Sequence, residues 1–548
     1  MKSKQSLLAL SLFAVMIAGC SKKSEEAASD ASVSAEYSTE QVAVDASADM
    51  EAAATADVVA TSPVVGSAEN TENYQKVETN SVKSVAQQPI STFSADVDTG
   101  SYTNVRRFLV QDRSLPPVDA VRVEEMINYF DYQYPQATGV HPFAVSSETV
   151  DSPWQPNAKV IKIGIKAKDI DQQNLPAANL VFLVDVSGSM NEPNKLPLVK
   201  KTLKILTKQL RPQDKVTLIT YSDGDKVVLA PTSGDQKQKI LKAIDQLVAG
   251  GGTAGEQAIQ MAYKSAQQGF VKGGINRILI TTDGDFNVGI TDFDTLKNMI
   301  ADKRKTGVSF STLGFGSGNY DEQLMEQLAD AGNGNYSYID NENEAKKVLQ
   351  RQMSSTLATV AQDLKLQVEF NPATVKEYRL IGYENRMLKE EDFNNDKVDA
   401  GDVGAGHTVT ALYEIIPVGQ KGWLADSRYA KNDASSGKKS EYAYLNIRYK
   451  LPNQSKSILL TQPISASSKP LSQANADTRF AIAVAAYGQQ LKGGQYNASM
   501  GWNDILNLTQ SAKQNDAYGL KAEFIDLVKR AKSLSPSVTK TAQINKAS

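Results

Sequence analysis

A chain of 548 residues has room for about two to four domains of ordinary size. Hydrophobic residues make up 41% of it and charged residues 22%, and a formal net charge of -3 provides no basic field for nucleic acid. One cysteine excludes a disulfide framework within the chain, and only two histidines argue against a zinc site built from Cys and His ligands. Any metal site should therefore use oxygen ligands.

The first residues of the chain resemble a bacterial lipoprotein signal. Lysines precede an apolar run from Leu7 to Ala18, which is too short for an ordinary membrane-spanning helix. The run ends in Ile17-Ala18-Gly19-Cys20, and small residues before a cysteine resemble a lipobox, which implies acylation of Cys20. An unprocessed signal or a chance cysteine is the alternative. Because Ser21 follows, the resemblance implies an anchor in the outer membrane, either periplasmic or surface-facing.

Residues 21–88 have the composition of a linker. They are rich in Ala, Ser, Val and acidic residues, and they contain 12 Asp or Glu against 4 Lys or Arg. No sustained helical or strand periodicity runs through them. We therefore predict a disordered acidic tether that extends because its charges repel one another.

Folded structure is expected from about residue 90. Residues 89–150 predict a small helical module, in which one helix carries Val105 and Leu109 on one face and a second follows Pro116-Pro117. Asp96 and Asp98 lie two residues apart, but the loop lacks the further oxygen ligands of an EF-hand. We do not expect a calcium site there.

Strand and helix patterns alternate through residues 151–358, beginning with a strand at 159–167 and a buried one at 181–184. This alternation predicts an α/β fold with a doubly wound, mostly parallel sheet. Residues 359–548 predict an α+β domain, with strands at 365–370, 408–416 and 442–450 and two or three closing helices.

Oxygen-bearing side chains follow two strands of the predicted sheet. Asp185-Val186-Ser187-Gly188-Ser189 comes after the strand at 181–184, and Asp283 comes after the strand at 277–281. Between them, Gly250-Gly251-Gly252-Thr253 presents a hydroxyl before a helix. Ligands bind at the carboxyl ends of strands in such sheets, so we expect these groups to meet. Two carboxylates and three hydroxyls suit a hard cation, although an Asp/Ser-rich strand end alone is equally consistent with a turn.

These motifs, in this order, resemble the metal-ion-dependent adhesion site of a von Willebrand factor type A domain. The resemblance implies direct ligation by Ser187 and Ser189, and ligation by Asp185 and Asp283 directly or through water. It also implies that Thr253 joins or leaves the shell as the domain changes state. Mg²⁺ is the expected occupant, with Mn²⁺ and Ca²⁺ as alternatives. Hydroxyls do not neutralise the cation, so if only one carboxylate contacts it directly, we expect an Asp or Glu of a protein partner to complete its shell.

The flanking segments extend the resemblance. The segments 92–99 (TFSADVDT) and 121–130 (VRVEEMINYF) resemble the amino-terminal module of bacterial YfbK-like von Willebrand type A lipoproteins. The segments 368–372 (VEFNP) and 378–383 (YRLIGY) resemble their carboxyl-terminal domain. The similarity covers roughly residue 90 to the end, and it implies no function for the flanking modules.

Enzymatic alternatives find less support in the sequence. Gly250-x-Gly252-x-x-Gly255 has dinucleotide spacing but follows a helical pattern, and no Gly-x-x-x-x-Gly-Lys-Ser/Thr loop is present, so we expect no nucleotide. His407 could be considered as a general base, but no nucleophile motif lies near it in the sequence, so we expect a loop or strand-edge residue. A metal-dependent hydrolase and a scaffold with a structural cation stay open. We expect a membrane-anchored, non-enzymatic envelope protein that binds a partner through its cation.

Overall fold

The computed structural model describes residues 71–95, 98–252, 255–284, 293–425, 438–452, 454–498, 500–513, 516 and 518–536, without the side chains of residues 172 and 350–357. The predicted signal peptide, Cys20 and the tether as far as residue 70 lie outside the described residues. In the described part of the chain, no helix combines the length and the apolar composition needed to cross a membrane.

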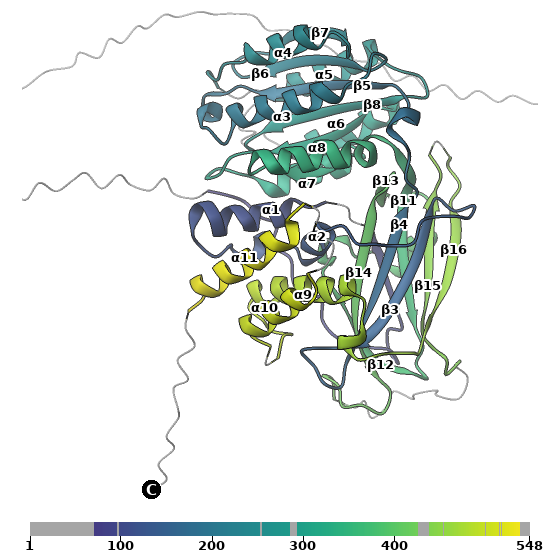
Figure 1. Cartoon of the computed structure of the whole chain (residues 1–548). Coiled ribbons are helices and arrows are strands. Elements are labelled where there is room, and N and C mark those ends of the chain that lie inside the picture. The colour runs from purple at the N-terminus through teal and green to yellow at the C-terminus, as the bar shows by residue number, and fades with distance from the viewer. Residues whose placement is uncertain are drawn as a thin grey trace, which may run out of the picture. The chain divides into compact units, whose positions relative to one another are not determined.

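A six-stranded sheet contains the strand that ends at Asp185 (Figure 1). Its order is β10-β9-β8-β5-β6-β7, and β5 pairs in parallel with both β6 and β8, while the edge strand β7 is antiparallel to β6. The strands are β5 (Ala178–Asp185), β6 (Lys215–Tyr221), β7 (Lys226–Ser233), β8 (Ile275–Thr282), β9 (Ser309–Gly314) and β10 (Tyr336–Tyr338). The mostly parallel sheet predicted from the sequence is confirmed. The order of the strands reverses at β5, because β6 lies on one side of it and β8 and β9 lie on the other. Such sheets bind ligands at the point where the strand order reverses.

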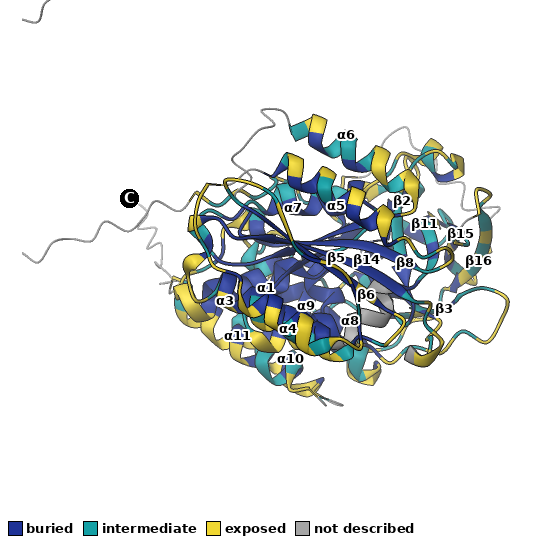
Figure 2. Cartoon of the chain, turned by 90° about the horizontal axis from the view of Figure 1, so that it is seen from above, coloured by how far each residue is buried: buried dark blue, intermediate teal, exposed yellow. Residues whose placement is uncertain are grey.

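Helices cover both faces of this sheet. Every residue of β5 is buried, and alternate residues contribute to two cores. On one side Phe182 and Val184 share a core with residues of α3 (Leu196–Gln209), α4 (Lys237–Asp245) and α8 (Glu342–Leu357). On the other, Val181 and Leu183 share a core with residues of α5 (Glu256–Gln268), α6 (Phe293–Lys303) and α7 (Glu322–Ala331). Figure 2 shows the strands buried and the outward faces of α3, α4 and α6 exposed.

Two further sheets pack face to face. One has the order β1-β12-β14-β4-β3, and the other has the order β13-β11-β15-β16 with β2 also paired to β11. Ile161, Ile163 and Ile165 of β4 share a core with Leu364 and Leu366 of β11. The strands are β1 (Lys83–Ser84), β2 (Ile90–Ser94), β3 (Phe143–Asp151), β4 (Lys159–Ala167), β11 (Thr359–Phe370), β12 (Val375–Ile381), β13 (Gly401–Gly404), β14 (Thr408–Pro417), β15 (Glu441–Lys450) and β16 (Ile458–Ser465).

Strand β4 does not belong to the parallel sheet, although it lies in the range 151–358 that the sequence analysis gave to the type A domain. It pairs antiparallel with β3 and with β14, which begins at Thr408. From Ile161 to Ala167, apolar residues alternate with lysine or glycine, which is typical of an antiparallel strand with one mainly apolar face, whereas β5 is apolar on both faces.

A layer of helices covers the outer face of the sheet that contains β4. It consists of α1 (Gly100–Arg107), α2 (Val123–Asn128), α9 (Ala476–Leu491), α10 (Trp502–Ser511) and α11 (Leu520–Leu534). Val123, Met126 and Ile127 of α2 share a core with Phe480 and Val484 of α9. Helices from the two ends of the chain therefore form one layer. Together with the pairing of β2 with β11, this joins the predicted amino-terminal module to the carboxyl-terminal domain.

Candidate metal centre

The turn after β5 gathers three oxygen-bearing side chains. Asp185 is fully buried, and one of its carboxylate oxygens, Oδ1, accepts the backbone N–H of Ser187 at 2.9 Å. A short 3₁₀ turn, Gly188–Asn191, then brings the Ser189 hydroxyl to 3.1 Å from the Ser187 hydroxyl. Three of the predicted ligands thus meet at the carboxyl end of the central strand.

The neighbouring strand β8 brings the second carboxylate to the same edge. The register pairs Val184 with Thr281, so β5 and β8 end side by side. The Thr282 hydroxyl donates to Oδ2 of Asp185 at 2.9 Å, and Asp283, which follows it, is fully buried. Gly284 then turns the chain with a φ of 87°, where a Cβ would lie 2.6 Å from the Asp321 nitrogen. Only glycine fits this close approach.

The glycine-rich loop lies against the turn after β5. Gly250 donates its N–H to the Val186 carbonyl at 2.7 Å, and the Gly251 carbonyl accepts the N–H of Gly188 at 2.9 Å. The side chain of Asp223, just beyond β6, accepts the N–H of Gly252. The predicted ligand Thr253 lies outside the described residues.

This loop does not have the geometry of a dinucleotide site. It follows helix α4 and precedes helix α5, whereas the dinucleotide fingerprint requires a strand before the glycines. The helical pattern that the sequence predicted before these glycines is confirmed.

Burial and a neighbouring charge raise the pKa of one carboxyl group at this site. Burial raises the pKa of Asp185 to about 6, and the negative charge of Asp283 adds to the rise, while hydrogen bonds from Ser187 and Thr282 oppose it. Burial beside the same carboxylates raises the pKa of the Tyr221 hydroxyl, at the end of β6. A cation placed between the carboxylates would offset this repulsion.

The donor set fits a small divalent cation. Hydroxyl and carboxylate oxygens are the ligands that Mg²⁺ and Ca²⁺ prefer, and they converge here from two strand ends. Within the described residues, no three His, Cys, Asp or Glu side chains form a metal-binding group, so a site here depends on the serine hydroxyls as well as on the carboxylates.

The loop between β9 and α7 forms a wall of this site. The Phe315 N–H donates to the Thr282 carbonyl at 3.0 Å, and the Asn319 amide donates to Oδ2 of Asp283 at 3.3 Å. The ammonium group of Lys195, which precedes α3, lies 2.9 Å from the same Asp283 oxygen. Asp283 therefore has polar contacts with two segments besides its own strand.

The first described residues of the chain bind the outer side of this wall. The N–H groups of Thr71 and Asn73 donate to the carbonyls of Gly318 and Tyr320, each at 2.9 Å, and Asn73 accepts from the N–H of Glu322 at 3.0 Å. Residues 71–88, predicted to belong to the tether, are thus in contact with the folded part of the chain. The prediction failed there because these contacts join the segment to residues more than 200 positions away.

Sequence reasoning missed four residues around the site, namely Thr282, Asp223, Lys195 and Asn319. Two of them carried a usable signal, because Thr282 and Asp223 lie at or just beyond the carboxyl ends of strands β8 and β6. Lys195 and Asn319 come from irregular segments, where no periodicity marks which way a side chain points.

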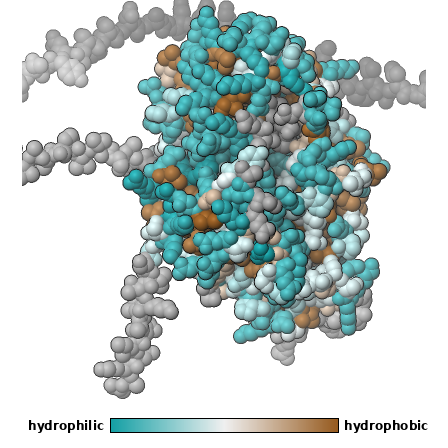
Figure 3. All heavy atoms as spheres, in the orientation of Figure 1, coloured by the Kyte–Doolittle hydropathy of each residue, from teal (hydrophilic) through white to brown (hydrophobic). Residues whose placement is uncertain are grey.

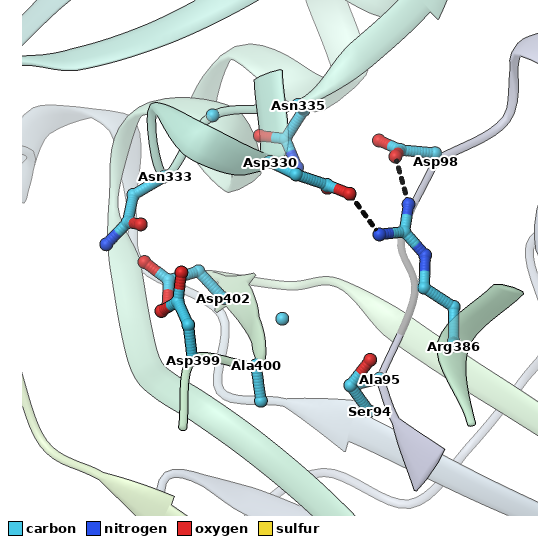
Figure 4. A pocket seen from close by; sticks show the side chains of 12 residues that line it. Ser94, Ala95, Asp98, Asp330, Asn333, Asn335, Arg386, Asp399, Ala400 and Asp402 are labelled. Atoms are coloured by element: carbon cyan, nitrogen blue, oxygen red, sulfur yellow. Dashed lines mark hydrogen bonds and ion pairs between the residues drawn. The ribbon is translucent and has the colours of Figure 1, made fainter. Parts of the chain in front are cut away.

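A separate hollow of about 140 Å³ lies by the end of α7 (Figure 4). Arg386 forms ion pairs there with Asp98 at 3.1 Å and with Asp330, while Asp399 and Asp402 line the opposite side. The four predicted ligands that the structure describes, Asp185, Ser187, Ser189 and Asp283, do not line this hollow. His407, considered above as a general base, directly precedes β14. It therefore lies beside a different sheet from the one that contains β5 and Asp185.

Family models of known proteins match three ranges of this chain. Residues 179–352 match the family model described as von Willebrand factor type A domain, and residues 68–162 match a model described as von Willebrand factor. The six-stranded sheet and its helices therefore form a von Willebrand factor type A domain, as the motifs predicted. Residues 355–534 match the model described as Uncharacterized protein YfbK, C-terminal.

The family of the chain follows from its similarity to one known protein over most of the length of both chains. The chain is 49% identical over 470 residues to the Escherichia coli (strain K12) protein described as Uncharacterized protein YfbK, covering 84% of this chain and 81% of that protein. The chain therefore belongs to the YfbK family of type A domain proteins. It is also 28% identical over 159 residues to human Inter-alpha-trypsin inhibitor heavy chain H4, covering 28% of this chain and 17% of that one. The solved von Willebrand factor type A structure from Catenulispora acidiphila is 17% identical, with a TM-score of 0.38, covering 70% of this chain and 89% of that chain.

Proposed function

We propose that this protein is a lipid-anchored envelope protein whose type A domain binds a divalent cation, and that an acidic side chain of a protein partner completes the metal shell. One observation carries the proposal: the ends of β5 and β8 bury Asp185 and Asp283 beside each other, next to the buried Ser187 and the partly buried Ser189, whose hydroxyls are 3.1 Å apart. Two like charges in one buried site favour a cation. Mg²⁺ is the expected occupant, held through Ser187, Ser189, Asp185 and Asp283, with Thr253 as a further ligand.

The charge of the site supports binding to an acidic partner. If only one of the two carboxylates contacts the cation directly, the hydroxyl ligands leave it with a net positive charge, so a carboxylate from outside is a suitable last ligand. The face seen in Figure 3 is mostly hydrophilic, with apolar side chains in small separate groups. Recognition through a metal and a carboxylate does not need a large apolar patch.

The first test measures metal binding alone. Calorimetric titration of the mature protein with Mg²⁺ should show one site, and Asp185→Ala should abolish it, because the variant removes a carboxylate that the fold buries at the site. Asp235→Ala is the matched control, since Asp235 is exposed in the same domain. Wild-type protein that binds no divalent cation would contradict the proposal.

The second test separates partner binding from its alternatives. A pulldown from envelope extract should capture a partner in Mg²⁺ but not in a chelator, and Asp185→Ala should capture none while keeping its circular dichroism spectrum. Equal capture by the variant would contradict a metal-mediated role. A large loss of thermal stability without a change in capture would favour a structural cation, and loss of hydrolytic turnover in the same variant would favour a hydrolase.

A further inference from the structure

Lys195 places a buried positive charge at the candidate metal centre. Its side chain is 4% exposed, and its ammonium nitrogen lies 2.9 Å from Oδ2 of the fully buried Asp283. The same nitrogen donates to the Asn319 side-chain oxygen at 3.3 Å. A lysine this far from water requires a compensating charge, and Asp283 supplies it.

The fold holds this lysine in place from both sides. Lys195 is the residue before α3, and its backbone carbonyl accepts the N–H of Val199 at 2.9 Å, in the first turn of that helix. Its aliphatic stem crosses Gly316, where an added Cβ would lie 2.5 Å from the lysine Cε. Gly316 also has a φ of 80°, which favours glycine. The loop that forms the wall of the site is therefore shaped around the lysine.

The lysine changes the charge of the site in both of its states. Asp185 and Asp283 together carry -2 when ionised, and Lys195 reduces this to -1. With a divalent cation bound, the same groups sum to +1 rather than zero. Coulomb interactions are stronger away from water, so the buried ammonium of Lys195 repels the cation. It also attracts an anion that approaches the metal-loaded site.

We propose that Lys195 is a built-in cation that sets the ligand preference of this site. Before metal binds, it neutralises Asp283 and keeps the empty site folded. After metal binds, it leaves the site with a net positive charge and so selects a carboxylate ligand over a neutral one. The proposal rests on the metal binding proposed above, and it assigns to Lys195 a positioning and specificity role rather than metal ligation.

The test uses Lys195→Met, which keeps the length of the stem and removes the charge. In chelator, we expect a lower melting temperature than in wild type, because the variant takes the ammonium away from the buried Asp283. In titrations, we expect Mg²⁺ to bind to Lys195→Met with an affinity at least about fivefold higher than to wild type, because a like charge has been removed. Trifluoroacetate binding to the Mg²⁺-loaded protein, followed by fluorine NMR relaxation, should weaken by about fivefold or more.

Opposite changes in the two affinities distinguish a charge effect from damage to the fold. Lys195→Arg retains the charge and should keep the affinities for Mg²⁺ and for trifluoroacetate close to those of wild type. Lys201→Met is the matched control, because Lys201 lies on α3 with a side chain that is 60% exposed. Unchanged affinities in Lys195→Met, or a parallel loss of both, would overturn the inference. If wild-type protein binds Mg²⁺ and only this pattern fails, the proposed function stands; if wild-type protein binds no Mg²⁺, both fall.

Discussion

Glu322 begins helix α7 with a carboxyl group that is only 1% exposed. Burial raises its pKa to about 8, and the nearby charges of Glu326 and Asp321 contribute, while Arg122 opposes them from 3.6 Å. A carboxyl group with a raised pKa binds protons more tightly in the folded than in the unfolded chain. Its contribution to stability is fully present below its unfolded pKa and is lost as the pH rises through the folded value.

This sign leads to a prediction for Glu322→Gln. Wild-type stability should contain a component that falls between about pH 4.5 and pH 8, at about 1.4 kcal/mol for each unit of pKa difference. The glutamine variant should lack that component, so its free energy of unfolding should change less over this window and exceed that of wild type most clearly near pH 8. Urea unfolding at several pH values measures it. An identical pH dependence in both proteins would contradict the assignment to Glu322.

At the scale of elements, the segment at residues 71–73 and the loop at residues 315–321 form one unit. The Glu72 side chain is 2% exposed, lies 2.8 Å from the Arg107 guanidinium and accepts the N–H of Gly318 at 2.8 Å. The loop in turn contacts Asp283 through Asn319. This part of the predicted tether is therefore connected to the candidate metal centre through two hydrogen bonds of the loop.

Glu72→Ala tests this connection. The change leaves Arg107, which is almost fully buried, without one of its carboxylates, and we expect a loss of about 3 kcal/mol in unfolding free energy. Hydrogen exchange should also become faster in residues 315–321, because the Gly318 N–H loses its acceptor. Glu78→Ala is the control, since Glu78 is exposed in the same segment. Unchanged exchange in the loop would show that the segment does not support it.

The elements also show what local sequence could and could not predict. The alternation of strands and helices, and the position of Asp185 and Asp283 at strand ends, follow from periodicities within a few residues. The pairing of β4 with β14 and of β2 with β11 could not be predicted this way, because the partners lie more than 200 residues apart. Lys195 and Asn319 were missed for a related reason, since only the folded loop brings them to Asp283.

At the scale of the whole molecule, buried ion pairs join the type A domain to the rest of the chain. Arg106 of α1 is paired with Asp340 and with Glu344 of α8, and it also reaches Glu523 of α11 at 2.9 Å. The Arg106 side chain is 6% exposed, and those of Asp340 and Glu344 are 2% and 1% exposed. Three parts of the sequence therefore depend on one guanidinium group, and removal of one partner from such a buried cluster typically costs about 3–5 kcal/mol.

Arg106→Met should consequently separate the unfolding of the type A domain from that of the remaining structure. All three tryptophans, Trp154, Trp423 and Trp502, lie outside residues 178–357, so their fluorescence reports only on the remaining structure, while far-ultraviolet circular dichroism reports on both. If wild type unfolds as one unit, the two signals should give coincident urea transitions, and in the variant they should diverge. Arg530→Met is the matched control, because its ion pair with Asp526 is exposed at 43% and 57% and should contribute little. Coincident transitions at an unchanged midpoint in Arg106→Met would mean that the apolar contacts between the two parts, rather than this cluster, hold them together.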